Sequence, residues 1–94
     1  DAGAWQARLA LASCYAAAGR GPEALAEYER VVAGGGAQSG MAWFLLGMGY
    51  EFSGRPAEAA RAFERSLALE PQGEVAKDAR THLARVKGTP NGAE

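Results

Sequence analysis

The chain has 94 residues, of which 48% are hydrophobic and 22% are charged, and its formal net charge is −1. These values describe one small domain or part of a larger protein. The 22 alanines supply about half of the hydrophobic residues, and the chain also has 13 glycines. Small side chains bury little apolar surface, so stability must come from a close approach of helices. The composition argues against the thick core of a globular enzyme.

Charge and cysteine content limit the possible partners and locations. The 10 basic and 11 acidic residues are interspersed, so nucleic acid and anionic membranes are not expected partners. The longest apolar stretch, Met41 to Tyr50, is about half as long as a bilayer-spanning helix. The lone Cys14 cannot form an internal disulfide and favours a reducing compartment such as the cytoplasm, although the sequence leaves the location open.

The first part of the chain predicts a pair of helices. Gly19 supplies a left-handed turn residue between them, and Pro22 opens the second helix. The run Gly34-Gly35-Gly36 stops this helix and connects it to the next. Because the run follows a helix rather than a strand, we do not interpret it as a phosphate-binding loop.

The second part of the chain predicts another pair of helices, with turn and stop residues of the same kind. Ser39 or Gly40 can cap a helix that runs to about Ser53, and Gly54 supplies the turn. The following helix runs from Pro56 to about Leu69 and is stopped by Pro71.

The segment Gln72 to Lys87 predicts a fifth helix. Its apolar residues recur at spacings of four, four and three, which is typical of one amphipathic helix: Val75, Ala79, Leu83 and Val86. No segment of the chain predicts a strand.

An offset of 35 positions aligns the chain with itself and reveals two copies of one unit. It pairs Leu11 with Leu46, Tyr15 with Tyr50, Gly19 with Gly54, Ala24 with Ala59 and Tyr28 with Phe63. We therefore expect a single domain over 1–87, made of repeat one (5–39), repeat two (40–73) and a capping helix (74–87). A flexible tail is expected over 88–94.

The second copy carries a family signature. Its anchors are Trp43-x2-Leu46-Gly47-x2-Tyr50, then Ala59-x3-Phe63 and Pro71, and their spacing resembles the tetratricopeptide repeat. The first copy has Arg8 where the tryptophan falls, and Trp5 one turn earlier can substitute for it in packing. The resemblance implies an all-α fold, an α-α superhelix of two antiparallel helix hairpins closed by a fifth, capping helix.

The pattern also has a packing interpretation that does not depend on the family. Small residues stand where the two helices of a pair cross, and large aromatic residues stand where the next pair leaves a gap. The expected repeat-packing anchors are Leu11, Tyr15, Ala24, Tyr28, Trp43, Leu46, Gly47, Tyr50, Ala59, Phe63 and Pro71. Cys14 aligns with Gly49 and is expected to be a small packed residue.

The resemblance implies a noncatalytic protein–protein interaction module in a scaffold or adaptor role. In this family a peptide or partner helix lies in a concave groove lined by the first helices of the repeats. The matching positions in this sequence are Gln6, Leu9, Ser13, Ala16, Ala17, Met41, Phe44, Met48, Glu51 and Phe52. We expect the groove to be formed chiefly by Leu9, Ser13, Met41, Phe44, Met48, Glu51 and Phe52.

An apolar stripe of Phe44, Met48 and Phe52 runs along the third helix at spacings of four residues. Neighbouring helices can cover this stripe, or it can form a groove for an apolar peptide. The alternative function is structural: the chain self-associates, for example as a homodimer, or stacks on further repeats through the same stripe. A carboxylate clamp is not expected, because its lysine and asparagine positions hold Leu9, Ser13, Phe44 and Met48.

The candidates for chemistry are weak. Asp78 and His82 lie four residues apart on one helix face, but a metal needs more ligands and the chain has no other histidine. Cys14 and His82 could form a nucleophilic pair only if the fold brought them together. We therefore expect no catalytic residue, no metal site and no cofactor, and we expect His82 to be either a solvent-exposed residue or a residue of a flanking helix.

Overall fold

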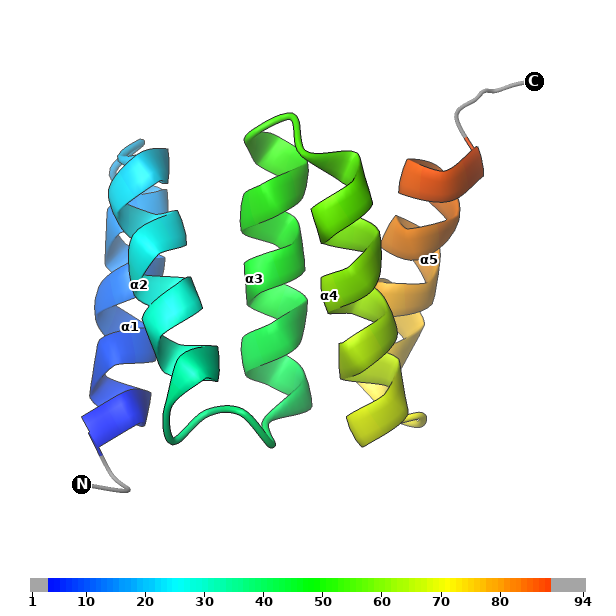
Figure 1. Ribbon diagram of the computed structural model, residues 1–94, viewed down its shortest axis with the longest axis horizontal. Helices are drawn as coiled ribbons and strands as arrows, with labels where there is room; N and C mark the ends of the chain where they lie inside the picture. The colour runs from blue at the N-terminus through cyan, green and yellow to red at the C-terminus, as the bar shows by residue number, and fades with distance from the viewer. Residues whose placement is uncertain (1–3, 89–94) are drawn as a thin grey trace.

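The structure, a computed structural model, describes residues 4–88, which form five α-helices and no strand. The helices are α1 (Ala4–Ala17), α2 (Gly21–Ala33), α3 (Gly40–Phe52), α4 (Pro56–Leu69) and α5 (Glu74–Gly88) (Figure 1). The predicted all-α fold is confirmed. Gly88, which was expected to begin the tail, is the last residue of α5; the rest of the predicted tail lies outside the described residues.

The helices form an elongated stack, 45 × 29 × 19 Å in extent. The α1–α2 hairpin lies at one end, α3 and α4 follow, and α5 packs against α4 at the other end (Figure 1). Helix α2 also contacts α3 and so joins the two hairpins. Within residues 4–88 no helix is long and apolar enough to cross a membrane.

The turn inside each hairpin is built in the same way. Gly19 and Gly54 adopt φ values of 79° and 75°, which only glycine adopts without strain. In both turns the arginine after this glycine lies over the ring of the preceding tyrosine, with guanidinium-to-centroid distances of 5.0 Å for Arg20–Tyr15 and 4.9 Å for Arg55–Tyr50. The expected left-handed turns are therefore present in both copies.

The connection between the hairpins ends in a helix cap. Ser39 is the N-cap of α3, and its Oγ accepts a hydrogen bond from the Ala42 backbone N–H at 3.1 Å. This bond satisfies one of the free N–H groups at the start of the helix. Helix α4 begins with Pro56, as predicted, whereas α2 begins at Gly21 with Pro22 in its second position.

The core consists of small residues placed against aromatic ones. One cluster is formed by Ala12, Ala24, Leu25, Tyr28, Leu46 and Ala62, and a second by Phe44, Ala59, Phe63 and Ala79. A Cβ atom on Gly47 would lie only 2.6 Å from Cε1 of Phe63, so the aromatic ring occupies the space that glycine leaves. Gly47, Ala24 and Ala59 are all buried, and the close crossing depends on their size.

At one pair of contacting positions, the two hairpins place a large and a small residue in opposite order. In the first, Trp5 packs against the glycine run, and a Cβ on Gly35 would lie 2.5 Å from Cδ1 of Trp5. In the second, the aligned positions hold Gly40 and Glu70, and a Cβ on Gly40 would lie 2.9 Å from Cδ of Glu70. Each hairpin therefore combines one large and one small residue here, in opposite order.

Three sequence expectations need correction. Leu11 is 44% exposed rather than packed, although the aligned Leu46 is 2% exposed. Cys14, expected to be packed, is also exposed. Both side chains lie on the face of α1 that corresponds to the α2-contacting face of α3, and no described helix covers that face. Pro71 is exposed and follows the end of α4 without acting as a buried anchor.

Candidate interaction surfaces

A groove lies between the C-terminal half of α1, the start of α2 and the C-terminal half of α3. This α1–α3 groove encloses about 860 Å³ and is lined by Ala16, Gly19, Gly21, Pro22, Ala24, Tyr28, Leu45, Met48, Gly49, Phe52 and Ser53. None of these side chains is charged. The groove can therefore receive an apolar ligand, with hydroxyl groups as its polar side-chain contacts.

Phe52 is the most exposed large apolar side chain of the described residues, with 84% of its surface accessible. It lies at the last position of α3, four residues after the half-buried Met48. Leu45 completes this apolar side of the groove. An aromatic ring so open to water favours association with another apolar surface.

The predicted apolar stripe of Phe44, Met48 and Phe52 does not stay on one face of α3, because a helix turns about 100° per residue. Residues four apart therefore advance by roughly 40° at each step, and Phe52 lies roughly 80° around α3 from Phe44. Met41, Leu45, Met48 and Phe52 share one side of α3, whereas Phe44 and Glu51 turn toward α5. Met41 is 43% exposed but lies at the other end of the helix and does not line the groove.

Phe44 belongs to the core and not to the groove. It is 9% exposed, and its ring centroid lies 5.8 Å from that of Phe63 and 5.7 Å from that of His82 on α5. Such distances are those of favourable aromatic pairs. The expectation that Phe44 binds a ligand is corrected, because the capping helix covers it; coverage by a neighbouring helix was one of the three interpretations of the stripe.

Glu51 is also engaged by the capping helix. Its two carboxylate oxygens lie 2.9 Å from Nδ1 of His82 and 2.9 Å from Nε of Arg85. The expected groove residue Glu51 therefore fixes α5 on α3. His82 is half-buried and packs against the rings of Phe44 and Phe63. Of its two expected placements, the solvent-exposed one does not hold, whereas the residue does lie on the flanking helix α5.

On α1 the expected groove residues have different roles. Leu9 is half-buried and packs against the first core cluster. Ser13 is exposed, and its Oγ lies 3.4 Å from the Tyr28 hydroxyl at the floor of the groove. Ala16 lines the groove directly, whereas Gln6 and Ala17 are exposed outside it.

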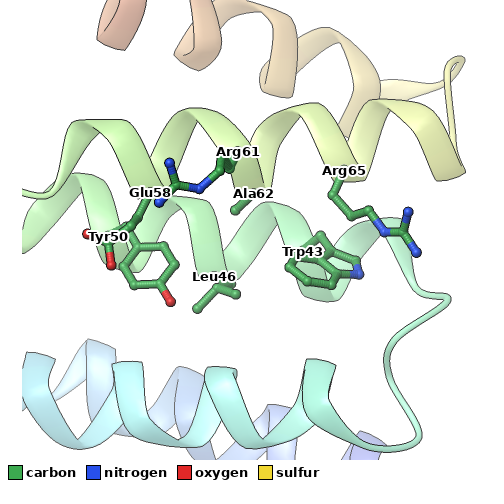
Figure 2. Close-up of a pocket in the computed structure, with 7 residues that line it drawn as sticks. All are labelled: Trp43, Leu46, Tyr50, Glu58, Arg61, Ala62 and Arg65. Atoms are coloured by element: carbon green, nitrogen blue, oxygen red, sulfur yellow. The ribbon is translucent and has the colours of Figure 1, made fainter.

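A second hollow, of about 410 Å³, lies between α3 and α4 on the side that faces α2. Figure 2 shows Trp43, Leu46 and Tyr50 in a row along α3, with Glu58, Arg61 and Arg65 projecting from α4. The guanidinium of Arg65 lies 5.9 Å from the Trp43 ring centroid. The indole N–H of Trp43 donates to the Ala37 carbonyl at 2.8 Å, so the predicted anchors here stabilise the junction of the two hairpins.

The electrostatics of this junction depend on Tyr50. Its hydroxyl donates a hydrogen bond to Glu29 of α2 at 2.7 Å. Burial, together with the bond to this carboxylate, raises the pKa of Tyr50 to about 12. Nearby, hydrogen bonds from Arg55 lower the pKa of Glu58. Both effects move the pKa of the group further from neutral pH.

The residues considered for chemistry are not brought together. His82 contacts Glu51 and Arg85, and these contacts do not include Asp78. Cys14 is exposed on α1, which makes no extensive contact with α5. Within residues 4–88 no group of three or more histidine, cysteine or acidic residues could hold a metal ion.

Residues 40–72 match the family described as tetratricopeptide repeat. This segment begins with α3 and ends just after α4, the hairpin in which every anchor of the pattern is present. This part of the chain is thus similar to a tetratricopeptide repeat. Repeats of this family generally mediate protein–protein interaction and are typically noncatalytic. No curated protein matches the chain.

Sequence reasoning missed most of the groove lining on the α2 side and Leu45 on α3. The inner side of α3 could have been found from the spacing of Met41, Leu45, Met48 and Phe52, which keeps to one helix face better than steps of four do. The glycines and Pro22 have no comparable signal, because they line the groove through the position of the turn.

Proposed function

We propose that this protein is a noncatalytic adaptor or scaffold that binds an apolar peptide or partner helix in the α1–α3 groove. The observation that carries the proposal is the 84% exposure of Phe52 beside a groove with no charged lining side chain. Met48, which lies next to Phe52 in the groove, adds an adaptable apolar contact.

The lining also favours one class of ligand. A peptide carboxylate in this groove would lose water without gaining a cationic partner, which is costly. Apolar side chains would instead cover Phe52, Met48 and Leu45. The proposed ligand is therefore a segment rich in leucine, methionine or aromatic residues and not a charged C-terminus.

The test is a selection of random peptides on the full chain, followed by measurement of the dissociation constant for the selected peptides. We expect apolar peptides whose Kd increases about tenfold or more in Phe52→Ser, because covering an aromatic side chain contributes about 1.5–3 kcal/mol. Leu11→Ser is the matched control, since it removes an exposed apolar side chain of α1 that does not line the groove.

Two results would contradict this proposal. One is a micromolar Kd for peptides selected through a charged C-terminus, and the other is unchanged binding in Phe52→Ser. Light scattering over a range of protein concentrations distinguishes peptide binding from the structural alternative, in which the chain self-associates. A dimer that is lost in Phe52→Ser would assign the surface to self-association.

A further inference from the structure

The hollow of about 410 Å³ between α3 and α4 is a surface separate from the α1–α3 groove. Because a helix turns about 100° per residue, Trp43, Leu46 and Tyr50 lie on the side of α3 roughly opposite Met48 and Phe52. The hollow and the groove have no lining residue in common. A ligand of this α3–α4 hollow would therefore be recognised independently of a peptide in the groove.

The floor of the α3–α4 hollow offers apolar contacts. The indole N–H of Trp43 donates to the Ala37 carbonyl at 2.8 Å. The hydroxyl of Tyr50 donates to Glu29 at 2.7 Å. Since both polar ends already have partners, the two rings and Leu46 between them present apolar surface to a ligand (Figure 2). Such a row favours an apolar or aromatic side chain.

Two arginines beside this row have no carboxylate partner within residues 4–88. Arg61 and Arg65 are exposed on α4, and neither takes part in an ion pair there. Glu58, the acidic residue of the hollow, accepts a hydrogen bond from Nε of Arg55 at 2.9 Å. Arg61 acts on Glu58 only through its charge, and Arg65 lies over the Trp43 ring.

The first hairpin shows how this arrangement is completed. The offset of 35 positions aligns Arg65 with Arg30 and Ala62 with Glu27. Nη1 of Arg30 lies 2.7 Å from the carboxylate of Glu27. The second hairpin keeps the arginine but has alanine in place of the glutamate. Figure 2 shows Ala62 between Arg61 and Arg65, so a carboxylate supplied from outside at this place would lie beside both arginines.

The charges around the α3–α4 hollow favour a single carboxylate. Three arginines and two glutamates lie in the hollow or contact its lining residues, which leaves one uncompensated positive charge: Arg55, Arg61, Arg65, Glu29 and Glu58. One carboxylate neutralises this charge and can form paired hydrogen bonds with a guanidinium. A phosphate group, with a charge of about −1.5 to −2, would exceed it.

We propose that the α3–α4 hollow binds an internal acidic segment of a partner protein. One aspartate or glutamate side chain of the segment takes the place that Glu27 has in the first hairpin, and pairs with Arg61 and Arg65. A neighbouring apolar side chain of the same segment packs on the row formed by Trp43 and Tyr50. Because the hollow and the groove lie on different sides of α3, occupation of one leaves the other open.

The test is a selection of random peptides on the Phe52→Ser chain, in which the α1–α3 groove lacks its aromatic contact. Peptides that also bind a double variant, Arg61→Gln with Arg65→Gln, are discarded. The remaining peptides are synthesised with blocked ends, so that no terminal charge contributes. The chain has two tryptophans, and Trp5→Phe leaves the fluorescence of Trp43 to report binding in the hollow.

We expect selected peptides that carry an acidic residue close to an apolar one. The Kd should increase about tenfold in Arg65→Gln, and by a similar factor when the acidic residue of the peptide is replaced by its amide, because a charge-assisted pair is lost. Arg61→Gln should weaken binding less. Lys77→Gln is the matched control, since it removes one positive charge from an exposed position of α5, and it should leave the Kd unchanged.

Circular dichroism shows whether each variant is folded, which separates lost contacts from lost structure. The proposal is overturned if no peptide prefers the parent chain to the folded double variant, or if the acidic peptide and its amide bind equally well. It is also overturned if Lys77→Gln weakens binding as much as Arg65→Gln, or if a phosphoserine peptide or an oligonucleotide binds more tightly. Since the selection uses Phe52→Ser, these results do not depend on peptide binding in the α1–α3 groove.

Discussion

The two hairpins share one sequence pattern, yet they differ in burial at aligned positions. Leu46 is 2% exposed and Leu11 is 44% exposed, although both occupy the same place in the repeat. The difference arises from neighbours, because α3 lies between α2, α4 and α5 whereas α1 makes its extensive contacts with α2. In a stacked repeat, burial is thus a property of the interface as much as of the residue.

The first hairpin has an ion pair where the second hairpin has apolar side chains. Arg8 and Glu27 form an ion pair at 2.7 Å, and the aligned positions in the second hairpin hold Trp43 and Ala62, which line one hollow. A partly exposed ion pair contributes little to stability, whereas burial of an indole contributes more. The second hairpin is therefore expected to be the more stable half.

The largest expected effects come from the aromatic residues of the second helices. Phe63 is 0% exposed and Tyr28 is 5% exposed, so Phe63→Ala and Tyr28→Ala should each lower the free energy of unfolding by about 3–5 kcal/mol. Urea denaturation measures this loss. Similar losses would show that the hairpins differ in their outer faces and not in their inner packing; a negligible loss for either would contradict the assigned core.

The leucine pair gives the sharpest contrast between the hairpins. Leu46→Ala should cost about 2–5 kcal/mol, because it leaves a cavity in the core. Leu11→Ala should cost less than about 1 kcal/mol, since its side chain is 44% exposed. Equal changes in urea midpoint would show that the repeat pattern alone determines stability, contrary to our interpretation.

The crossing of α3 and α4 should resist a larger residue. Ala59 is 0% exposed, so Ala59→Leu should overpack the crossing and destabilise the protein by about 1–3 kcal/mol. Ala57→Leu, at an exposed position of the same helix, is the control and should have little effect. A melting experiment without a loss for Ala59→Leu would count against the assigned register.

The smallest effect concerns the tyrosine that joins the hairpins. The pKa of Tyr50 is raised to about 12, above its unfolded value of about 10. Its neutral hydroxyl therefore stabilises the fold below about pH 10, and this contribution is lost as the pH rises toward 12. Urea midpoints between pH 9 and 12 should fall less steeply in Tyr50→Phe than in the wild type. Tyr15→Phe serves as the control and should keep the steep fall.

The sequence predicted the helices and turns well because local signals define them. Gly19, Gly54, Ser39 and Pro56 act within a few residues of the chain, and their roles follow from backbone geometry and capping alone. The residues at the helix crossing could also be predicted from the sequence, because the spacing of Gly47 and Ala59 indicates which face of each helix contacts its partner helix.

The site was less predictable because it depends on what covers each helix face. Phe44 and Phe52 have the same spacing from Met48 in the sequence, but α5 covers Phe44 whereas Phe52 lies at the open end of α3. Likewise, nothing in the pattern distinguishes Leu11 from Leu46. Exposure was decided by the position of each hairpin in the stack, which a repeat signature does not encode.

The exchange of sizes between Trp5–Gly35 and Gly40–Glu70 also protects the chain against pairing the wrong helices. If α1 packed against α4, Trp5 would meet Glu70, and two large side chains would compete for one space. If α3 took the place of α1 as the hairpin partner of α2, Gly40 would meet Gly35 and leave a void. Repeated units are prone to misassembly of this kind, and here side-chain volume identifies the correct partner of each helix.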